Sequence, residues 1–152
     1  MPHFEVTTNI AAPPRRVFDV SLDVDVHTAS MTDAGERVVD GVTSGRMALG
    51  ETVTWQARHF GLLWRMTSRI SAFDPPEHFV DEQVDGPFRL WRHEHHFEPD
   101  GRGGTLMRDV VDYAAPLRPL GVIAEAAVLN RYLPRLISTR NEHVKAIAEA
   151  AD

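Results

Sequence analysis

The pattern of apolar and polar residues divides the chain into three parts. Residues 3–12 alternate in the manner of a half-buried strand, and the prolines at positions 13 and 14 end it. The apolar positions of residues 15–22 recur at helical spacing, and residues 23–27 begin a second short helix or turn with an aspartate as a candidate cap. The first part therefore predicts one strand followed by two short helices.

Residues 36–115 form the second part and read as five or six antiparallel strands. Turn signals separate runs that are rich in β-branched and aromatic residues, with a spacing of roughly 8–12 residues. The signals fall at positions 40–41, 45, 50, 61, 74–76, 85–87 and 99–104. Such regular punctuation predicts a meander of sequential antiparallel strands.

The third part, residues 120–150, has the apolar spacing of a long amphipathic helix. Pro116 and Pro119 separate it from the last strand, and we expect Pro134 to kink it because proline removes a backbone hydrogen bond. The apolar stripe should face the core. The solvated side is predicted to consist of Glu125, Arg131, Arg135, Arg140, Asn141 and Glu142.

Together the three parts predict an α+β fold. A strongly curved antiparallel sheet of about six to seven strands would wrap around the C-terminal helix, with the two short helices at one open end. Because a curved sheet and a straight helix do not match in shape, we expect a hollow between them.

Composition narrows the function classes. The 152 residues suit a single domain spanning 1–152, and the absence of cysteine excludes disulfides, thiolate nucleophiles and cysteine-based zinc sites. A net charge of −6 argues against a nucleic-acid partner, and no apolar stretch is long enough for a membrane span. The start lacks the basic and apolar regions of a signal peptide. We therefore expect a cytoplasmic monomer or homodimer that acts on a small molecule without a cofactor.

The hairpin over residues 88–113 holds the candidate chemistry. Its odd-numbered positions carry aromatic and imidazole side chains and are predicted to face inward. If the turn is centred on Gly101, His93 lies opposite Asp109 and His95 lies opposite Met107. This pair could act as a general acid–base, with Asp109 orienting His93, or it could be a polar contact that fixes the strand register.

The segment His93-Glu94-His95-His96 contains the residue types of a metal-binding site. On a strand only His93 and His95 share a face, and these two with Asp109 could form a three-ligand site. We predict no metal, because alternating histidines on strands are common without one. The remaining histidines show no partner spacing and are interpreted as surface or core residues: His3, His27, His59, His78 and His143.

Aromatic residues on the predicted strands alternate with inward polar groups. This interleaving is typical of core packing, and also of an apolar pocket with a few aimed polar groups. Asp81 and Gln83 could join the same wall. The predicted ligand-binding residues are Trp55, His59, Trp64, Trp91, His93, His95, Phe97, Met107, Asp109, Tyr113, Leu129 and Leu133.

Several segments together resemble the SRPBCC superfamily, also called the START-like or Bet v 1-like helix-grip fold. They are residues 10–13, 17–19, 73–76, 86–97, 104–105, 107–109, 113 and 116–117, followed by the long last helix. The stretch 86–97 is similar to the branch described as polyketide cyclase/dehydrase-like or CoxG-like. The resemblance implies a deep apolar cavity under the last helix, and it implies no fixed catalytic set.

Three functions follow from these observations. The first is binding of a hydrophobic or aromatic ligand, lipid-like or polyketide-like, without chemistry. The second is a metal-independent aromatase/cyclase or dehydratase, a lyase or isomerase, in which His93 and Asp109 move a proton next to a carbonyl. The third is a protein-interaction or self-sacrificing resistance domain in which the cavity is incidental.

Overall fold

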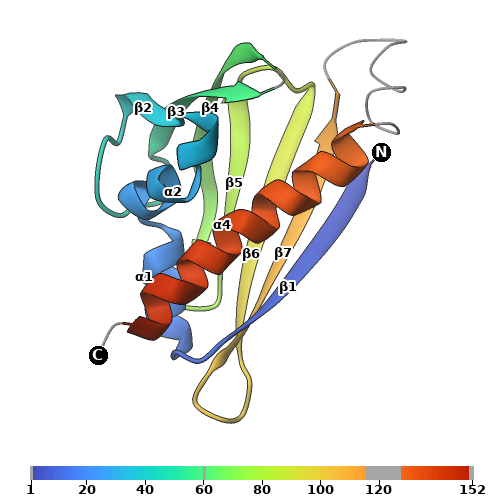
Figure 1. Ribbon diagram of the computed structural model, residues 1–152. Coiled ribbons are helices and arrows are strands. Elements are labelled where there is room, and N and C mark those ends of the chain that lie inside the picture. Colours follow the sequence, from blue (N-terminus) through green and yellow to red (C-terminus); the bar gives the residue numbers. More distant parts are fainter. Residues whose placement is uncertain (1, 60, 116–127, 151–152) are drawn as a thin grey trace.

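The computed structural model describes residues 2–59, 61–115 and 128–150. Seven strands and one long helix account for most of these residues (Figure 1). The elements are β1 (His3–Ile10), α1 (Pro14–Ser21), α2 (Val24–Ser30), the short 3-10 helix η1 (Thr32–Ala34), β2 (Arg37–Gly41), β3 (Thr52–His59), β4 (Leu62–Asp74), β5 (His78–Asp85), β6 (Leu90–Pro99), β7 (Thr105–Ala114) and α4 (Asn130–Ala150).

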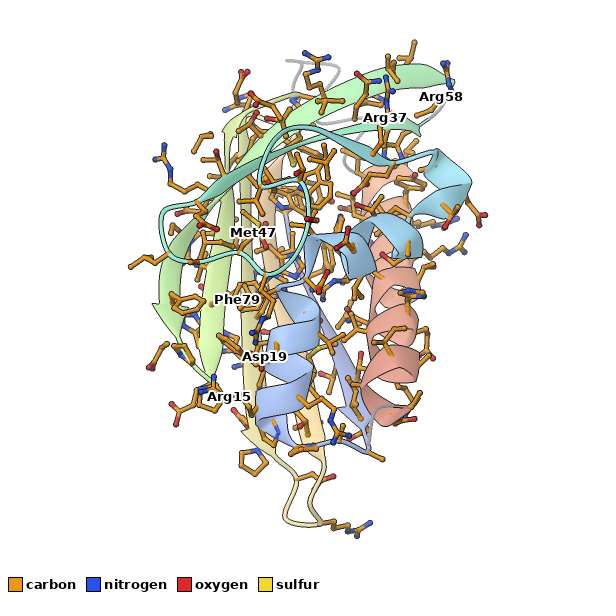
Figure 2. All side chains as sticks on the ribbon, turned by 90° about the vertical axis from the view of Figure 1, so that its left-hand side faces the viewer. Arg15, Asp19, Arg37, Met47, Arg58 and Phe79 are labelled. Atoms are coloured by element: carbon orange, nitrogen blue, oxygen red, sulfur yellow. The ribbon has the colours of Figure 1, made fainter. Side chains whose placement is uncertain are left out.

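All seven strands form one antiparallel sheet in the order β1-β7-β6-β5-β4-β3-β2. The sheet curves around α4, which crosses its inner face diagonally (Figure 1). Seen from the side, α1 and α2 lie on the same side of the sheet as α4, and Phe79 points into the space between the sheet and α1 (Figure 2). The predicted helix-grip fold, with two short helices after the first strand, is confirmed.

Local chemistry explains the first two helices. Pro14 occupies the first position of α1, where its missing N–H costs nothing. Asp23 caps α2, because its side chain accepts hydrogen bonds from the backbone N–H groups of Asp25 and Val26. Both helices are short, so their stability depends on packing against the sheet rather than on intrinsic propensity.

Phe18 packs α1 against the sheet. Its ring makes edge-to-face contacts with Phe73, Phe79 and Phe97, at centroid distances of 5.6, 5.5 and 5.4 Å. Each such pair adds about 0.5–1.5 kcal/mol beyond the area buried. The main core gathers around this cluster, and a second core lies around Trp91.

One glycine fixes the junction between β2 and β3. Gly41 has φ of 81°, in the left-handed region, and a Cβ atom there would lie 2.3 Å from the carbonyl oxygen of Thr52. A side chain at this position would therefore force the two strands apart, at the point where a bulge between Val38 and Asp40 bends the edge of the sheet.

The described part of the last helix agrees with the predicted helix over Asn130–Ala150. Residues 120–127 of the predicted helix lie outside the described residues, and Pro134 is the fifth residue of α4. The hydrogen bond that Pro134 cannot donate would have reached Asn130, at the N-terminal end of the helix. Figure 1 shows α4 as one continuous helix, and the kink expected at Pro134 stays a prediction.

The predicted solvated side of α4 is wrong at Arg140 and Asn141. These residues are only 3% and 1% exposed. They follow Ile137 and precede Val144 on the face that meets the sheet, since residues three and four apart lie on one side of a helix. The inward stripe is therefore polar at its centre. None of the helices in the described residues is both long and apolar enough to cross a bilayer.

The hairpin register also differs from the prediction. His95 lies opposite Asp109, and His93 lies opposite Val111, so the pairing is displaced by two residues from one centred on Gly101. A shift of two residues keeps every side chain on its predicted face. The inward position of the odd-numbered residues is unchanged, and only the partners differ.

Candidate functional site

A cavity of about 500 Å³ lies between the inner face of the sheet and the helices. Strands β3 to β6 form its back, α4 forms its front, and α2 closes one side. Most of the lining is apolar. Eight of the predicted ligand-binding residues lie on this wall: Trp55, His59, Trp64, Trp91, His93, His95, Leu129 and Leu133.

The other predicted site residues lie behind the wall. Phe97 and Met107 are buried in the core around Phe18, and they do not line the cavity as described. Tyr113 packs in the second core and donates a hydrogen bond to the side chain of Asn130, which ties β7 to the start of α4. Asp109 is fully buried and does not line the cavity as described.

Two histidines and two aspartates meet at one wall of the cavity. His93 Nε2 lies 2.7 Å from Asp109 Oδ1, and His95 Nε2 lies 2.6 Å from Asp81 Oδ2. His93 Nδ1 is 3.9 Å from the same Asp81 oxygen, beyond hydrogen-bond distance. The predicted contact between His93 and Asp109 is thus present, although it runs diagonally between the strands and not directly across them.

Asp109 is the hub of this polar cluster. Its Oδ2 atom accepts a hydrogen bond of 2.6 Å from Asn141, and Arg140 Nη1 lies 3.6 Å from its Oδ1 atom. The Asn141 amide also reaches Thr8 on β1, at 3.3 Å. Strand β6 and helix α4 therefore supply the groups that hold one buried carboxylate, as a buried charge requires, and β1 helps to position Asn141.

Ring stacking sets the orientation of the two histidines. The imidazoles of His93 and His95 stack with centroids 3.8 Å apart, and Phe79 stacks on the other side of His95 at 4.1 Å. Trp91 meets His93 edge-on at 6.3 Å. Packing on both sides of the imidazole pair leaves the ring edges, which carry the nitrogens, for the carboxylates and the cavity.

Burial and charge decide the protonation states of the wall. Burial lowers the pKa of His93, the adjacent His95 lowers it further, and the hydrogen bond to Asp109 only partly opposes this. Burial would raise the pKa of Asp109, but the hydrogen bond from His93 and the nearby Arg140 hold it well below its usual range. His93 is therefore a neutral imidazole that donates from Nε2 to an ionised carboxylate.

Asp81 is the polar group of the wall that the cavity reaches most directly. Its side chain is 21% exposed, and it lines the cavity together with His93 and His95. Enclosure pushes the pKa of Asp81 up, but the hydrogen bond from His95, the neighbouring imidazoles and Arg140 bring the pKa below its ordinary value. The wall therefore presents an ionised carboxylate beside two imidazoles.

A second polar contact lies at the far end of the cavity. His59 on β3 forms a hydrogen bond with the Tyr132 hydroxyl on α4. Burial lowers the pKa of His59 and raises the pKa of Tyr132, so both groups are neutral near pH 7. This contact joins β3 to α4 beside the exposed Leu62.

Sequence reasoning missed several groups of the site. Arg140 lines the cavity, and its guanidinium also donates to the backbone carbonyl of Ser21. Helical spacing from Ile137 could have placed it inside, but its charge favoured the solvated side. Gln83, expected on the wall, instead holds the β5–β6 connection by hydrogen bonds with the backbone of Phe88.

The cavity wall does not present a preformed metal centre. Donor atoms of Asp81, His93 and His95 lie within 4.8 Å of one another. However, the two imidazoles stack on each other and Phe79 packs on His95, so packing holds the rings in their present orientation. The Nε2 atoms of His93 and His95 are engaged by Asp109 and Asp81, and the arrangement is that of a hydrogen-bond network.

Comparisons with known proteins agree with this architecture. A family model described as polyketide cyclase/dehydrase and lipid transport matches residues 1–149. The crystal structure of TTHA0849 from Thermus thermophilus superposes with a TM-score of 0.75 at 20% identity, over 97% of this chain and 99% of that one. A search of the curated proteins finds no match.

Two further solved structures resemble the chain. The Zhui aromatase/cyclase from Streptomyces sp. R1128 has a TM-score of 0.70 at 17% identity, with 99% of this chain and 98% of that chain covered. Ginseng major latex-like protein 151 from Panax ginseng has a TM-score of 0.65 at 15% identity, with 97% of each chain covered. At these identities the structures establish the fold alone.

Proposed function

Because the chain belongs to the polyketide cyclase/dehydrase and lipid transport family, we propose that it binds a hydrophobic small molecule of lipid or aromatic polyketide type in the cavity beneath α4. The observation that carries the proposal is a cavity of about 500 Å³ whose lining is mostly apolar. Cavities of this size and character are typical of small-molecule sites.

The placement of the polar groups defines how such a ligand would lie. Asp81, His93 and His95 occupy the β5–β6 wall, whereas Trp55 and Trp64 line the part of the cavity formed by β3 and β4. A ligand with an apolar body and one hydroxyl or carbonyl group would place its body against the indoles and its polar group at the imidazoles. A ligand without such a polar group would bind more weakly, because it would cover the polar side chains of that wall without offering them a hydrogen bond.

A neutral fluorescent probe tests the binding proposal. We expect 1-aminoanthracene to bind with a blue-shifted, enhanced emission, and Ala57→Trp to abolish this binding because Ala57 lines the cavity on β3. The matched control is Arg58→Trp, whose side chain is exposed on the opposite face of the same strand. Equal probe affinity in the two variants would contradict binding in the cavity, and native mass spectrometry of the purified chain would reveal a retained ligand.

The geometry of His93 favours a second function, a cyclase-type enzyme. With Nε2 held by Asp109, the neutral imidazole keeps its lone pair on Nδ1, at the cavity wall. A base in this position could remove a proton from the carbon next to a carbonyl, which is the first step of an aldol-type ring closure or a dehydration. His93 would be the base, and Asp109 would fix its tautomer.

Proton exchange separates the two functions. In D2O, an enzyme with this base should accelerate hydrogen–deuterium exchange at the acidic carbon of 2-tetralone, a bicyclic ketone small enough for the cavity. His93→Phe should remove at least 100-fold of the acceleration, because positioned acid–base groups contribute about 10²–10⁴-fold. Exchange at the uncatalysed rate in the wild-type protein, with the probe still bound, would leave ligand binding as the function.

A further inference from the structure

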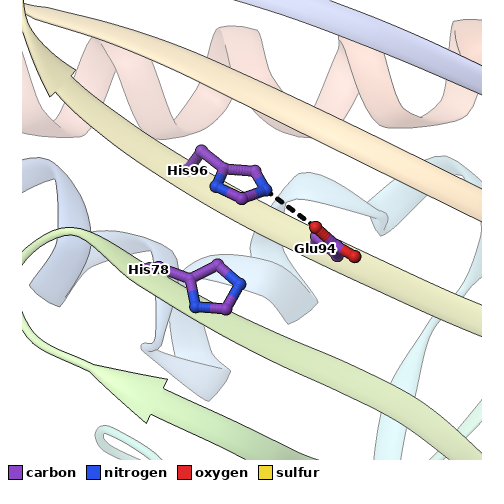
Figure 3. Close-up of side chains that lie close together, drawn as sticks. All are labelled: His78, Glu94 and His96. Carbon is purple, nitrogen blue, oxygen red and sulfur yellow. Dashed lines mark hydrogen bonds and ion pairs between the residues drawn. The ribbon is translucent and has the colours of Figure 1, made fainter.

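A second group of histidines lies on the outer face of the sheet, opposite the cavity. His78 on β5 and His96 on β6 are directly paired across the two strands, and Glu94 precedes His96 by two residues. Because strand side chains alternate, these three residues share the outer face, whereas His93 and His95 point inward. Figure 3 shows the three side chains grouped over β5 and β6.

The three side chains are already close to one another. The imidazoles of His78 and His96 have centroids 4.7 Å apart, and His96 Nε2 lies 2.9 Å from Glu94 Oε2. One donor atom from each residue lies within 4.8 Å of the other two. Ligands of a tetrahedral ion with bonds near 2.1 Å lie about 3.4 Å apart, so small side-chain rotations suffice to bring the donors together.

These side chains have room to make that rotation. Glu94 and His96 are each 24% exposed at the side chain, and His78 is also partly exposed. Val80, which lies directly opposite Glu94 on the same face, is fully buried and gives the group an apolar neighbour. The inner imidazoles differ, because packing on both sides holds them in their present orientation.

We propose that His78, Glu94 and His96 form a binding site for a divalent transition-metal ion such as Zn²⁺ or Ni²⁺, with water completing the coordination. Two imidazoles and one carboxylate are the ligand types that these ions prefer, whereas Mg²⁺ and Ca²⁺ favour all-oxygen sites. The bound ion would bridge β5 and β6 directly behind the wall that carries His93 and His95.

The arrangement of Glu94 leaves a carboxylate oxygen for a cation. Its side chain forms an ion pair with Arg92 and a hydrogen bond with His96. Arg92 engages Oε1 of Glu94 and leaves Oε2 on the side of His96.

Isothermal titration of the untagged full chain with Zn²⁺ tests the site. We expect one ion per chain, and His78→Ala or His96→Ala should weaken Zn²⁺ binding by at least about tenfold. The control is His3→Ala, since His3 is another surface imidazole beside a carboxylate, Asp112, but lacks a second imidazole. This variant should leave the affinity within a factor of about two, and Mg²⁺ should not compete.

The position of the bound Zn²⁺ ion completes the test. Imidazole proton signals of His78 and His96 should shift with Zn²⁺, while those of His93 and His95 keep their positions. No Zn²⁺ binding by the wild type, or equal binding by a variant with His78, Glu94 and His96 all replaced by alanine, would overturn the proposal. A response confined to His93 and His95 would also overturn it. None of these results depends on whether the cavity binds a ligand.

Discussion

Strands β5 and β6 carry histidines and carboxylates on both faces, and the two faces hold them differently. On the inner face His93 and His95, together with Asp109 on the adjacent strand β7, are almost fully buried, and hydrogen bonds and stacked rings fix their orientation. On the outer face His78 and His96 are partly exposed and only loosely stacked. The same residue types thus form a rigid network under helices and an adaptable group in contact with water, so enclosure rather than composition decides their chemistry.

Removing the hub of the inner network should have the largest effect on stability. Asp109→Ala leaves His93, Asn141 and Arg140 without their shared carboxylate, and breaking such a buried charge pair costs about 3–5 kcal/mol. Urea unfolding measures the loss. The matched control is Asp112→Ala on the outer face of the same strand. Its ion pair with His3 is exposed, so the loss should stay below about 1 kcal/mol. Equal losses would remove the distinction between the faces.

The pH dependence of stability should come next in size. His93 has a lowered pKa in the folded protein, so its contribution is fully present above the unfolded pKa of about 6.5 and is lost as the pH falls through the lower folded value. The lowered pKa of His59 and of His78 acts in the same direction. We expect the free energy of unfolding to decrease from pH 7 to pH 5, by at most about 1.4 kcal/mol per pH unit for each proton.

A variant measures how much His93 contributes to this dependence of the unfolding free energy on pH. His93→Gln keeps a donor for Asp109 but cannot titrate, so its unfolding free energy should depend less on pH than that of the wild type. The control is His78→Gln on the outer face, which should reduce the slope less because His78 is less enclosed. Identical slopes for wild type and His93→Gln would show that His93 does not titrate on unfolding in this range.

The outer carboxylate should matter little to stability. Glu94→Gln removes an ion pair with Arg92 that is partly exposed and screened by salt. The expected loss is below about 1 kcal/mol and should diminish further in 1 M NaCl. Urea unfolding at two salt concentrations provides the measurement. A loss approaching that of Asp109→Ala would mean that the outer group is as tightly integrated as the inner one.

The smallest effect concerns the competition between Arg92 and a metal ion. Arg92→Ala frees Glu94 and removes a positive charge beside the proposed site. Because an exposed ion pair is worth at most about 1 kcal/mol, Zn²⁺ affinity should rise by a factor of about 2 to 5. Isothermal titration resolves a change of this size. A decrease in affinity would indicate that Arg92 positions Glu94 for the ion instead of competing for it.

The sequence predicted the fold and the faces well because both depend on periodicity. Alternation along β6 placed His93 and His95 inside and His96 outside, and the structure agrees. Alternation could not determine the hairpin register, because a shift of two residues preserves every face. Turn geometry decides the register, and the direct partner of Asp109 is therefore His95.

The buried polar stripe of α4 could not be predicted from residue character. Arg140 and Asn141 are of types that mostly lie on the surface, and only a buried partner justifies their placement inside. That partner, Asp109, lies on β7 and approaches α4 only after the sheet has curved. Cross-strand neighbours such as His78 and His96 escaped notice for the same reason, since their pairing depends on the register of β5 against β6.

The position of β1 at the edge of the sheet has a consequence for synthesis on the ribosome. Its neighbour is β7, so β1 can pair only after β7, which contains Asp112 opposite His3, has been synthesised. The hydrogen bond from Asn141 to the Thr8 hydroxyl can form only later, once α4 has been synthesised. Within this sheet the strand synthesised first is thus the strand paired last, and until β7 has been made β1 has two unpaired edges that are open to aggregation.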